Sequence, residues 1–316
     1  MQHNTFLGIE IGGTKLQICA GDEHSNIVTK FQFQVDALGG GALIRKKIEE
    51  TISEIMLPEL AGIGIGFGGP VNYLTGDIAS SFQVDGWSGF NIIQWMKEFA
   101  GVKVAVDNDA NVAALAEALY GAGKDFERVL YLTLGSGVGG GFVIDQKIYH
   151  GRFPGEIEIG HIRLEKAGKT LESSCSGWAV DKKIRDAITL NPSGMLAQLV
   201  GDRKRGEAMV LLQALNRNDD ISWKLFNDTT DDLAFGLSHA IHILNPDAIV
   251  IGGGLSYLGD ILMSSLTEKI PGYLMRPFIP APPIFTAALK DMTVPVGALA
   301  LARQSVEQKV NHNNGQ

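Results

Sequence analysis

The sequence predicts an α/β protein made of two related halves, and three observations lead to this prediction. Apolar runs of strand length alternate with segments of helical periodicity along most of the chain. A glycine-rich turn between two apolar strands occurs at residues 12–13 and again at 135–141, which indicates an internal duplication. The chain has 316 residues, enough for two domains, and its 39 glycines are concentrated at such turns.

The first half is expected to begin with three strands. The apolar runs FLGIEI and LQICAG flank the first glycine turn, and IVTKFQFQV alternates in polarity. Apolar residues then recur at helical spacing, and an alanine-rich segment stops at a glycine. The expected elements are strands at 6–11, 16–21, 27–35, 62–67 and 102–106, and helices at 42–57, 91–100 and 111–123.

The second half repeats the order of strand, glycine turn and strand, and then adds longer helices. A proline-rich loop precedes its last strand, and a helix of small residues follows that strand. The expected elements are strands at 129–134, 142–144, 247–251 and 284–289, and helices at 176–188, 220–244 and 296–306. The polar residues 311–316 are expected to form a flexible tail.

Composition excludes several classes of protein. The formal net charge of −8 opposes general binding of nucleic acid, which needs clustered Lys and Arg. The first residues lack the pattern of a secretory signal, and no apolar run reaches the length of a membrane span. Cys19 and Cys175 are too few for a disulfide framework. A cytoplasmic protein without a membrane partner is therefore expected.

The glycine turns match neither of two common nucleotide motifs. Residues 135–140 have the spacing G-x-G-x-x-G, but a strand-like run follows where a dinucleotide-binding fold needs a helix. The segment GAGKD lacks the Ser or Thr of a P-loop. Each turn alone is better explained by an ordinary hairpin. Two matched turns with a third glycine cluster at 252–254 favour backbone nests that cradle phosphate.

The polar cluster Asp107-Asn108-Asp109 stands where a predicted strand meets a predicted helix. Asn108 or Asp109 can serve simply to cap the helix, since both residue types are preferred there. One cap is enough, however, and the carboxyl end of a strand is where ligands bind in an open α/β sheet. A carboxylate at this place can accept a hydroxyl proton as that oxygen attacks phosphorus.

Six segments occur in the order seen in one protein family: GIEIGGTK, GGPV, NDAN, LGSGVGGG, EIGH and NPDAIVIGGGL. On these segments the chain resembles the ROK family of sugar kinases and sugar-responsive repressors over residues 7–303. The resemblance implies the actin-like ATPase (hexokinase-like) fold, with two ribonuclease H-like lobes and a cleft that closes on ATP, Mg²⁺ and a sugar. The smaller lobe would be 1–118, with the helix at 296–310 packed back on it, and the larger lobe 119–295.

The resemblance also implies roles for individual residues. Asp109 would be the general base, and Asn108 would hold a neighbouring sugar hydroxyl. The residues implied to contact ATP are Gly12, Gly13, Thr14 and Lys15 in the first turn, Gly135, Ser136 and Gly137 in the second, and Gly253 and Gly254 beside the adenosine. A homodimer is implied as well.

Two motifs of the first half depart from the family pattern. Glu10 stands where the family has Asp, so the carboxylate that organises the Mg²⁺, through water, is longer by one methylene. Phosphate positioning is sensitive to displacements of about 1 Å. The family's sugar-facing P-N-L-x-G-W appears here as FQVDGW at 82–87. Gln83 would replace the Asn as a hydroxyl ligand, or it is an ordinary loop residue.

The family's structural zinc site is not expected in this chain. Of its three cysteines and one histidine only His161 is in place, because residues 162–170 contain no cysteine and Cys175 falls beyond the block. Carboxylates are poor replacements for these ligands. The resemblance instead carries over Glu158, His161 and Glu172 as a set that binds sugar hydroxyls.

The expected function is an ATP-dependent hexose kinase, either glucokinase-like or acting on an N-acetylhexosamine or fructose. The repressor class is discarded, since the first strand starts near Phe6 and leaves no room for a helix-turn-helix before it. Glu10 and the lost zinc block keep open a catalytically weak or inactive sugar-binding relative with a regulatory role. Polyphosphate as the donor in place of ATP also stays open.

Overall fold

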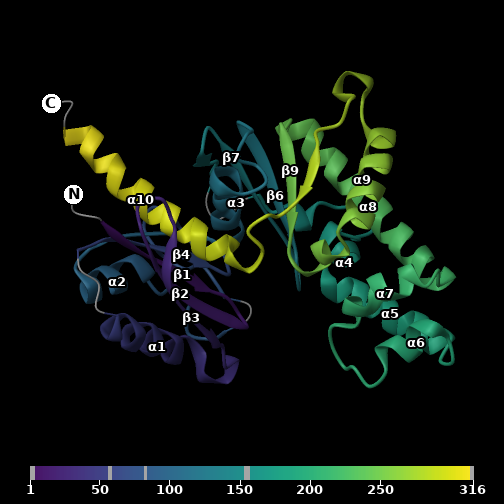
Figure 1. The fold of residues 1–316 in the computed structure, drawn as a ribbon, viewed down its shortest axis with the longest axis horizontal. Coiled ribbons are helices and arrows are strands. Elements are labelled where there is room, and N and C mark those ends of the chain that lie inside the picture. The colour runs from purple at the N-terminus through teal and green to yellow at the C-terminus, as the bar shows by residue number, and fades with distance from the viewer. Residues whose placement is uncertain (1–3, 56–58, 82–83, 153–156, 314–316) are drawn as a thin grey trace. The chain divides into compact units, whose positions relative to one another are not determined.

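The computed structural model describes residues 4–55, 59–81, 84–152 and 157–313 (Figure 1). Its contacts divide the chain into two units. The first contains residues 1–121, 141–156 and 291–316, and the second contains 122–140 and 157–290. The sequence analysis assigned residues 141–156 to the larger lobe, whereas the contacts group them with the N-terminal residues. The division falls inside a strand and not at a linker, so no linker in the sequence marks it.

The first unit is built on a five-stranded sheet in the order β3-β2-β1-β4-β5. Strands β1 and β2 pair antiparallel around the first glycine turn, β3 pairs antiparallel with β2, and β1, β4 and β5 run parallel. β1 and β2 are buried on both faces, which explains their continuous apolar runs, whereas the edge strand β3 alternates between half-buried and exposed residues. The strands are β1 (Thr5–Ile11), β2 (Lys15–Gly21), β3 (Ile27–Gln34), β4 (Leu60–Phe67) and β5 (Lys103–Asn108).

The α-helices of the first unit are α1 (Gly40–Glu54), α2 (Ile92–Ala100), α3 (Asp109–Tyr120) and α10 (Thr293–Asn313). Helices α1 and α2 bury Ile48 and Ile92 in one core with the strand residues Ile9 and Ile65. This core follows from the helical spacing of apolar residues in the two helices and from the apolar strands they cover.

Helix α10 lies along β1 and β4 and approaches their backbones closely (Figure 1). Glycine makes this approach possible, since a Cβ at Gly64 would overlap the carbonyl oxygen of Ala298. A Cβ at Gly297 of α10 would likewise overlap the carbonyl oxygen of Val112 in α3. Helix α3 is therefore buried on nearly all sides, which explains its alanine-rich composition and gives its N-terminus a rigid support.

The second sheet has the order β10-β9-β6-β7-β8. Strands β6, β9 and β10 run parallel, and β7 pairs antiparallel with β8. The boundary between the two units falls within β7, between Gly140 and Gly141. The strands are β6 (Arg128–Leu134), β7 (Val138–Ile144), β8 (Lys147–Ile148), β9 (Ala248–Gly252) and β10 (Ile284–Thr286).

The longest helix of the second unit, α8, packs against α4 and α9. It begins at the N-cap Asp219, whose carboxylate accepts the N–H of Ser222, and ends at Asn245 in the left-handed conformation. The α-helices of this unit are α4 (Leu171–Cys175), α5 (Gly177–Leu190), α6 (Met195–Val200), α7 (Leu211–Asn216), α8 (Asp220–Leu244) and α9 (Asp260–Lys269).

The strands and helices predicted from hydrophobic periodicity are present, but the sequence analysis missed the short helices α4, α6, α7 and α9. In α9 only Leu262 and Leu266 are buried, so its apolar stripe is too thin to give a clear pattern. Residues 311–313, expected in a flexible tail, continue α10. The other residues of that predicted tail, 314–316, lie outside the described residues.

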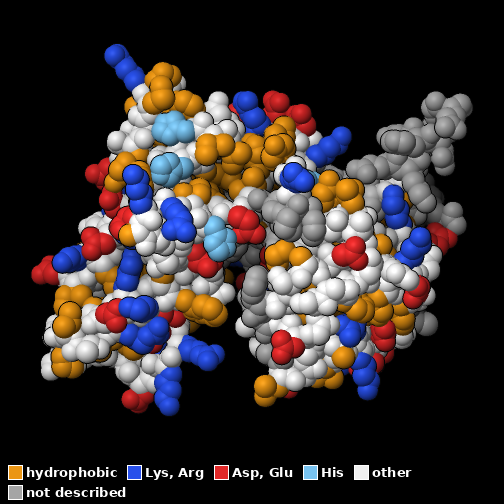
Figure 2. Space-filling model, turned by 180° about the vertical axis from the view of Figure 1, so that it is seen from behind, with side chains coloured by type: hydrophobic (Ala, Val, Ile, Leu, Met, Phe, Trp, Pro, Cys, Tyr) orange, Lys and Arg blue, Asp and Glu red, His pale blue; other side chains and the backbone are white. Residues whose placement is uncertain are grey.

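Two observations bear on the two excluded classes, membrane-spanning proteins and general nucleic-acid-binding proteins. Among the residues that the structure describes, none of the helices combines the length and hydropathy needed to cross a membrane. On the face drawn in Figure 2, basic side chains are interspersed with acidic ones.

Candidate active site

Asp109 lies at the N-terminus of α3, directly after β5. Asn108 is the N-cap, because its Oδ1 accepts the N–H of Ala110 at 2.9 Å. The amide nitrogen of Asn108 donates to the carbonyl oxygen of Gly69 at 3.3 Å. Capping, one of the two roles considered for this cluster, therefore falls to Asn108 and not to Asp109.

The carboxyl group of Asp109 lies beside the turn that follows β4. A Cβ at Gly68 would stand 3.4 Å from Asp109 Oδ2. Burial, and after it the negative charge of Glu10, raises the pKa of Asp109 to about 7, while Lys15 acts in the opposite direction. A carboxyl group with this pKa is matched to taking up a proton near neutral pH.

Glu10, on β1, is held by two side chains of β2. Lys15 Nζ lies 3.2 Å from Glu10 Oε1, and the side-chain amide of Gln17 donates to Oε2. The register of the two strands places Gln17 directly opposite Glu10. Gln17 is fully buried and also donates to the carbonyl oxygen of Asp291 at 3.2 Å. Glu10 is therefore a largely buried carboxylate with a fixed orientation, close enough to Asp109 to raise its pKa.

The first glycine turn connects β1 and β2. The N–H of Gly12 donates to the carbonyl oxygen of Lys15 at 2.9 Å, which closes the hairpin. Thr14 is exposed, and its carbonyl oxygen accepts the N–H of Val35 at 2.9 Å. Because the N–H of Gly12 has a partner inside the turn, the predicted phosphate contacts are left to Gly13, Thr14 and Lys15.

The second glycine turn connects β6 and β7. The N–H of Gly135 donates to the carbonyl oxygen of Gly137 at 3.0 Å, and the carbonyl oxygen of Gly135 accepts the N–H of Gly177 at 2.7 Å. Ser136 is exposed between them. The turn is therefore tied to the first residue of α5 and presents the side chain of Ser136 to solvent.

Glu172 supports this second turn. Its Oε2 accepts the N–H of Val138 at 2.9 Å, and a Cβ at Gly137 would stand 2.5 Å from the same oxygen. A capping box formed by Thr170 and Ser173 begins α4 and sets the direction of Glu172 in its first turn. A residue predicted to bind sugar thus also contacts the turn predicted to bind phosphate.

Glu158 and His161 lie at either end of a short 3₁₀ turn that precedes α4. Their side chains are 51% and 71% exposed, and His161 Nε2 lies 4.0 Å from Glu158 Oε2. The turn packs on the start of β7, where a Cβ at Gly160 would overlap the carbonyl oxygen of Val138. Val138 is also the residue that Glu172 contacts, so the three predicted sugar ligands gather around the start of β7.

Gln83, the remaining predicted sugar ligand, lies outside the described residues. The tryptophan of the same motif, Trp87, is 1% exposed and packs edge-on against Phe67 and Phe90. That end of the motif therefore belongs to the core of the first unit.

Cys175 is a core thiol. It is fully buried on α4, its Sγ donates to the carbonyl oxygen of Thr229 at 3.4 Å, and burial raises its pKa to about 12. Among the described residues, no group of three or more His, Cys, Asp and Glu side chains could hold a metal ion. The expectation that the chain carries no structural zinc stays a prediction.

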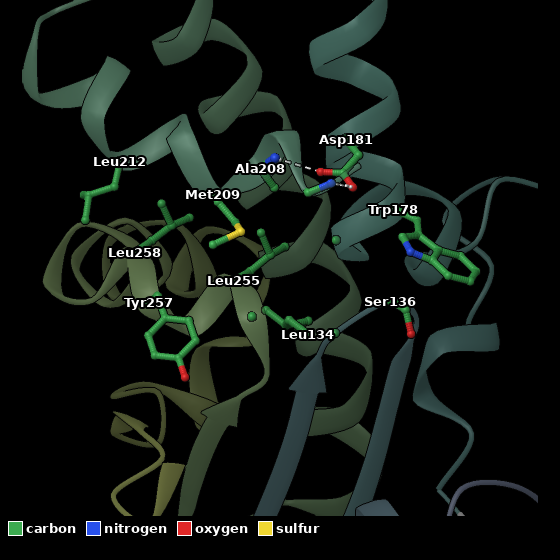
Figure 3. Close-up of a pocket in the computed structure, with 14 residues that line it drawn as sticks. Leu134, Ser136, Trp178, Asp181, Ala208, Met209, Leu212, Leu255, Tyr257 and Leu258 are labelled. Atoms are coloured by element: carbon green, nitrogen blue, oxygen red, sulfur yellow. Dashed lines mark hydrogen bonds between the residues drawn. The ribbon is translucent and has the colours of Figure 1, made fainter. Parts of the chain in front are cut away.

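A pocket of about 450 Å³ opens beside the second glycine turn (Figure 3). Gly253, with a φ of +80°, packs on the backbone of Leu134, where a Cβ would stand 2.6 Å from that backbone. Gly254, which follows it, lines the pocket together with Gly135 and Ser136. The apolar lining residues, which the sequence analysis missed, are Leu134, Trp178, Ala208, Met209, Leu212, Leu255, Tyr257 and Leu258.

Asp181 shapes one wall of this pocket. Its carboxylate accepts the N–H groups of Gly206 at 3.1 Å and Ala208 at 2.7 Å (Figure 3). One helical turn later on α5, Arg185 pairs with Glu207 at 2.8 Å. The segment 206–208 is thereby fastened to α5. No local sequence motif indicates such a contact.

The fold is that of the ROK sugar kinases of known structure. The chain matches the ROK family glucokinase from Streptomyces griseus, solved in complex with glucose and AMPPNP, with a TM-score of 0.81 and 26% identity over 96% of this chain and 100% of that chain. It matches the ROK hexokinase from Thermus thermophilus with a TM-score of 0.80 and 25% identity, over 96% and 99%. The predicted α/β fold with two actin-like lobes is confirmed.

The chain belongs to the ROK family, whose model matches residues 6–305. The glucokinase of Thermotoga maritima is 28% identical over 310 residues, which are 95% of this chain and 98% of that protein. The glucokinase of Halalkalibacterium halodurans is 30% identical over 290 residues, 87% of this chain and 88% of that protein. The resemblance predicted from the six motifs is confirmed.

A transcriptional regulator of the ROK family shares the fold, with a TM-score of 0.84 at 21% identity, over 96% of this chain and 78% of that chain. The fold alone therefore does not separate kinases from regulators. The function has to be argued from the site.

Proposed function

We propose that this protein is an ATP-dependent hexose kinase with Asp109 as its general base. The observation that carries the proposal is the half-buried carboxyl group of Asp109 at the carboxyl end of β5, with its pKa raised to about 7. Similarity to glucokinases over nearly the whole chain supports the same activity. The complex of a similar enzyme with glucose and AMPPNP supports a sugar as acceptor and ATP as donor.

In this reaction the ionised carboxylate of Asp109 accepts the proton of a sugar hydroxyl. The hydroxyl oxygen forms a bond to the γ-phosphorus of ATP as the bond to the β,γ-bridging oxygen breaks, so the products are a sugar phosphate and ADP. Helix α3 is buried, and Asn108 caps it, so the base is held on a rigid support. In the Asn108 side chain, Nδ2 donates one hydrogen bond and Oδ1 accepts one, so the second N–H of Nδ2 and the second lone pair of Oδ1 are left for the predicted contact with a sugar hydroxyl.

The adenosine of ATP is assigned to the pocket beside the second glycine turn. The apolar walls suit a purine ring, and Gly254 allows close approach of the backbone. Ser136 and the backbone of the turn 135–137 are at the edge of the same pocket, where they would meet the phosphates. In the first glycine turn, Gly13, Thr14 and Lys15 stay the residues predicted to contact phosphate.

The carboxylate of Glu10 is a suitable ligand for Mg²⁺. In kinases this ion is bound by carboxylate oxygens together with phosphate oxygens. When bound, the ion neutralises charge on the transferring phosphate. Glu10 would hold it through water. Lys15, which pairs with Glu10, adds a positive charge at the same place.

The sugar is assigned to Glu158, His161 and Glu172, as the family resemblance implies. Carboxylate oxygens accept hydrogen bonds from sugar hydroxyls, and an imidazole donates or accepts them. The exposure of Glu158 and His161 leaves both side chains open to a ligand. The homodimer and the cytoplasmic location stay predictions. The identity of the hexose is left to the assay below.

A coupled assay of ADP release tests the proposal, with ATP and Mg²⁺ and a panel of glucose, fructose, mannose and N-acetylhexosamines. We expect one of these sugars to stimulate ADP release, and Asp109→Asn to lower kcat by at least about 100-fold. The exposed Asp125→Asn is the matched control and should retain full activity. Full activity of Asp109→Asn would remove the base from the mechanism.

A catalytically weak sugar-binding relative is the second candidate, favoured by Glu10 in place of the family's Asp. It predicts sugar binding in calorimetry without ADP release. Glu10→Asp separates the two, because it would raise turnover in a weak enzyme and leave an active one unchanged or impaired. Polyphosphate as the donor releases no ADP, so it is tested by measuring formation of sugar phosphate from polyphosphate in the absence of ATP.

A further inference from the structure

A buried carboxylate, Asp107, stands two residues before the proposed base. We infer that His150, acting through Asp107, is a positioning residue that fixes the N-terminus of α3 and with it the carboxyl group of Asp109. The inference rests on the proposed role of Asp109 as the base. The sequence analysis gave His150 no role and treated Asp107 only as part of a polar cluster.

Asp107 is 1% exposed, and both of its oxygens have partners. Oδ1 accepts the backbone N–H of Asn108 and the side-chain amide of Asn111, each at 2.9 Å. Oδ2 lies 2.6 Å from Nε2 of His150. Because an ionised carboxylate can only accept, Nε2 of His150 carries the hydrogen in this contact. His150 is thus the only partner of Oδ2 found among the described residues.

His150 reaches Asp107 from a distant segment. It follows β8, stands 43 residues from Asp107 in the chain, and its side chain is 20% exposed. Its ring stacks on Tyr73, with centroids 3.6 Å apart and planes 10° apart. Tyr73 lies in the loop after β4, so loops from two parts of the first unit meet at the start of α3. The stack fixes the plane of the imidazole and so directs Nε2 at the carboxylate.

The bonds of Asp107 span the position of the base. They reach Asn108, which precedes Asp109, and Asn111, which lies two residues after it. Loss of His150 would leave one oxygen of a buried carboxylate without its donor, and such a group costs enough free energy to force a rearrangement. The junction of β5 and α3 would then shift. A displacement of about 1 Å at a reacting group can lower the rate by about 100-fold.

The variants His150→Ala and His150→Gln test the inference with the full-length protein. Ala removes the hydrogen bond, whereas the amide of Gln can still donate to Asp107. We expect His150→Ala to lower kcat by about 10- to 100-fold with the KM values for sugar and ATP changed less than about threefold. We expect His150→Gln to recover most of that loss. The matched control is His24→Ala, which removes a 74% exposed histidine of the same unit.

A double-mutant cycle with Asp107→Asn tests whether His150 acts through Asp107. We expect Asp107→Asn/His150→Ala to lose little more activity than the more impaired single variant, because the two residues form one interaction. Additive losses would overturn the inference. Unchanged kcat in His150→Ala, equal losses in His150→Ala and His150→Gln, or an effect confined to KM would also overturn it.

The outcomes separate this inference from the proposed function. If Asp109→Asn is inactive and His150→Ala has the wild-type kcat, the kinase proposal stands and the positioning role fails. If Asp109→Asn retains full activity, the base assignment fails first. If His150→Ala does not fold, the kcat of His150→Gln is measured in its place. We expect a near-normal kcat in this variant, and a strongly reduced kcat in the folded variant counts against the role.

Discussion

Glu172 accepts the backbone N–H of Val138 at 2.9 Å, directly after the second glycine turn. The same oxygen would stand 2.5 Å from a Cβ at Gly137. The contact links a proposed sugar ligand to the turn proposed to hold phosphate, within one unit of the protein. A Cβ at residue 137 would therefore have to displace the Glu172 carboxylate, although the backbone at this residue needs no special conformation.

Gly137→Ala should disturb this contact and weaken ATP binding. The added methyl group forces Glu172 or the turn to move, so we expect the KM for ATP to rise about tenfold and the protein to lose about 1–3 kcal/mol of stability. Steady-state kinetics and thermal unfolding measure the two effects. Gly272→Ala is the control, since a Cβ there meets nothing within 4 Å. An unchanged KM for ATP in Gly137→Ala would show that the turn does not bind the donor.

The activity should depend on pH through Asp109. The base has to be ionised, and its pKa is raised to about 7. We therefore expect kcat/KM to rise with pH, to reach about half of its plateau at about pH 7 and to level off above about pH 8, with about one-tenth of the plateau value at pH 6. Initial rates with saturating Mg²⁺ between pH 5.5 and 8.5 measure the profile. A flat profile over this range would contradict the assignment.

The same raised pKa predicts how stability changes with pH. In the unfolded chain the Asp109 carboxyl ionises near its ordinary value of 3.8, whereas in the folded protein it holds its proton up to about pH 7. Its contribution to folding is therefore fully present below about pH 4 and is lost as pH rises through about 7.

Asp109→Asn should show this difference in thermal unfolding. At pH 8 the variant should be more stable than the wild type by about 1–2 kcal/mol, a figure reduced because the side chain is only half-buried. The difference should shrink toward pH 4. A difference in stability that is the same at both pH values would mean that the carboxyl group is not strained by burial.

Asp181→Ala should impair the nucleotide pocket without affecting the base. The variant frees the N–H groups of Gly206 and Ala208, so the wall made by 206–208 keeps only the Arg185–Glu207 pair as its tie to α5. We expect the KM for ATP to rise about tenfold, because an ordered wall is lost, with the KM for sugar unchanged. Asp186→Ala, at an exposed position of the same helix, is the control. Equal effects of the two variants would remove Asp181 from the pocket's support.

Zinc should be absent from the purified protein. Metal analysis is expected to give far less than one zinc per chain, because Cys175 is buried with its thiol pKa raised to about 12 and is no ligand in that state. Activity after treatment with EDTA should return fully on addition of Mg²⁺ alone. Near-stoichiometric zinc would contradict the prediction.

Local sequence was sufficient for much of the fold. The burial of β1 and β2 on both faces produces apolar runs that can be read directly, and the spacing in α8 shows its buried face. The motif NDAN located Asp109 at the junction of a strand and a helix. The short helices were missed because one or two buried residues give no recognisable period.

The sequence by itself determined the α/β class, the family and the position of the candidate base, because periodicity and ordered motifs are contained in short windows. Only the tertiary structure decided that Asn108 caps α3, that Glu172 supports the second turn, and that His150 holds Asp107. The tertiary structure also brings together the pocket residues, which come from β6, α5 and the segments around 206–212 and 254–258. These contacts join residues far apart in the chain, and their geometry is set by the packing of whole elements, which no single window encodes.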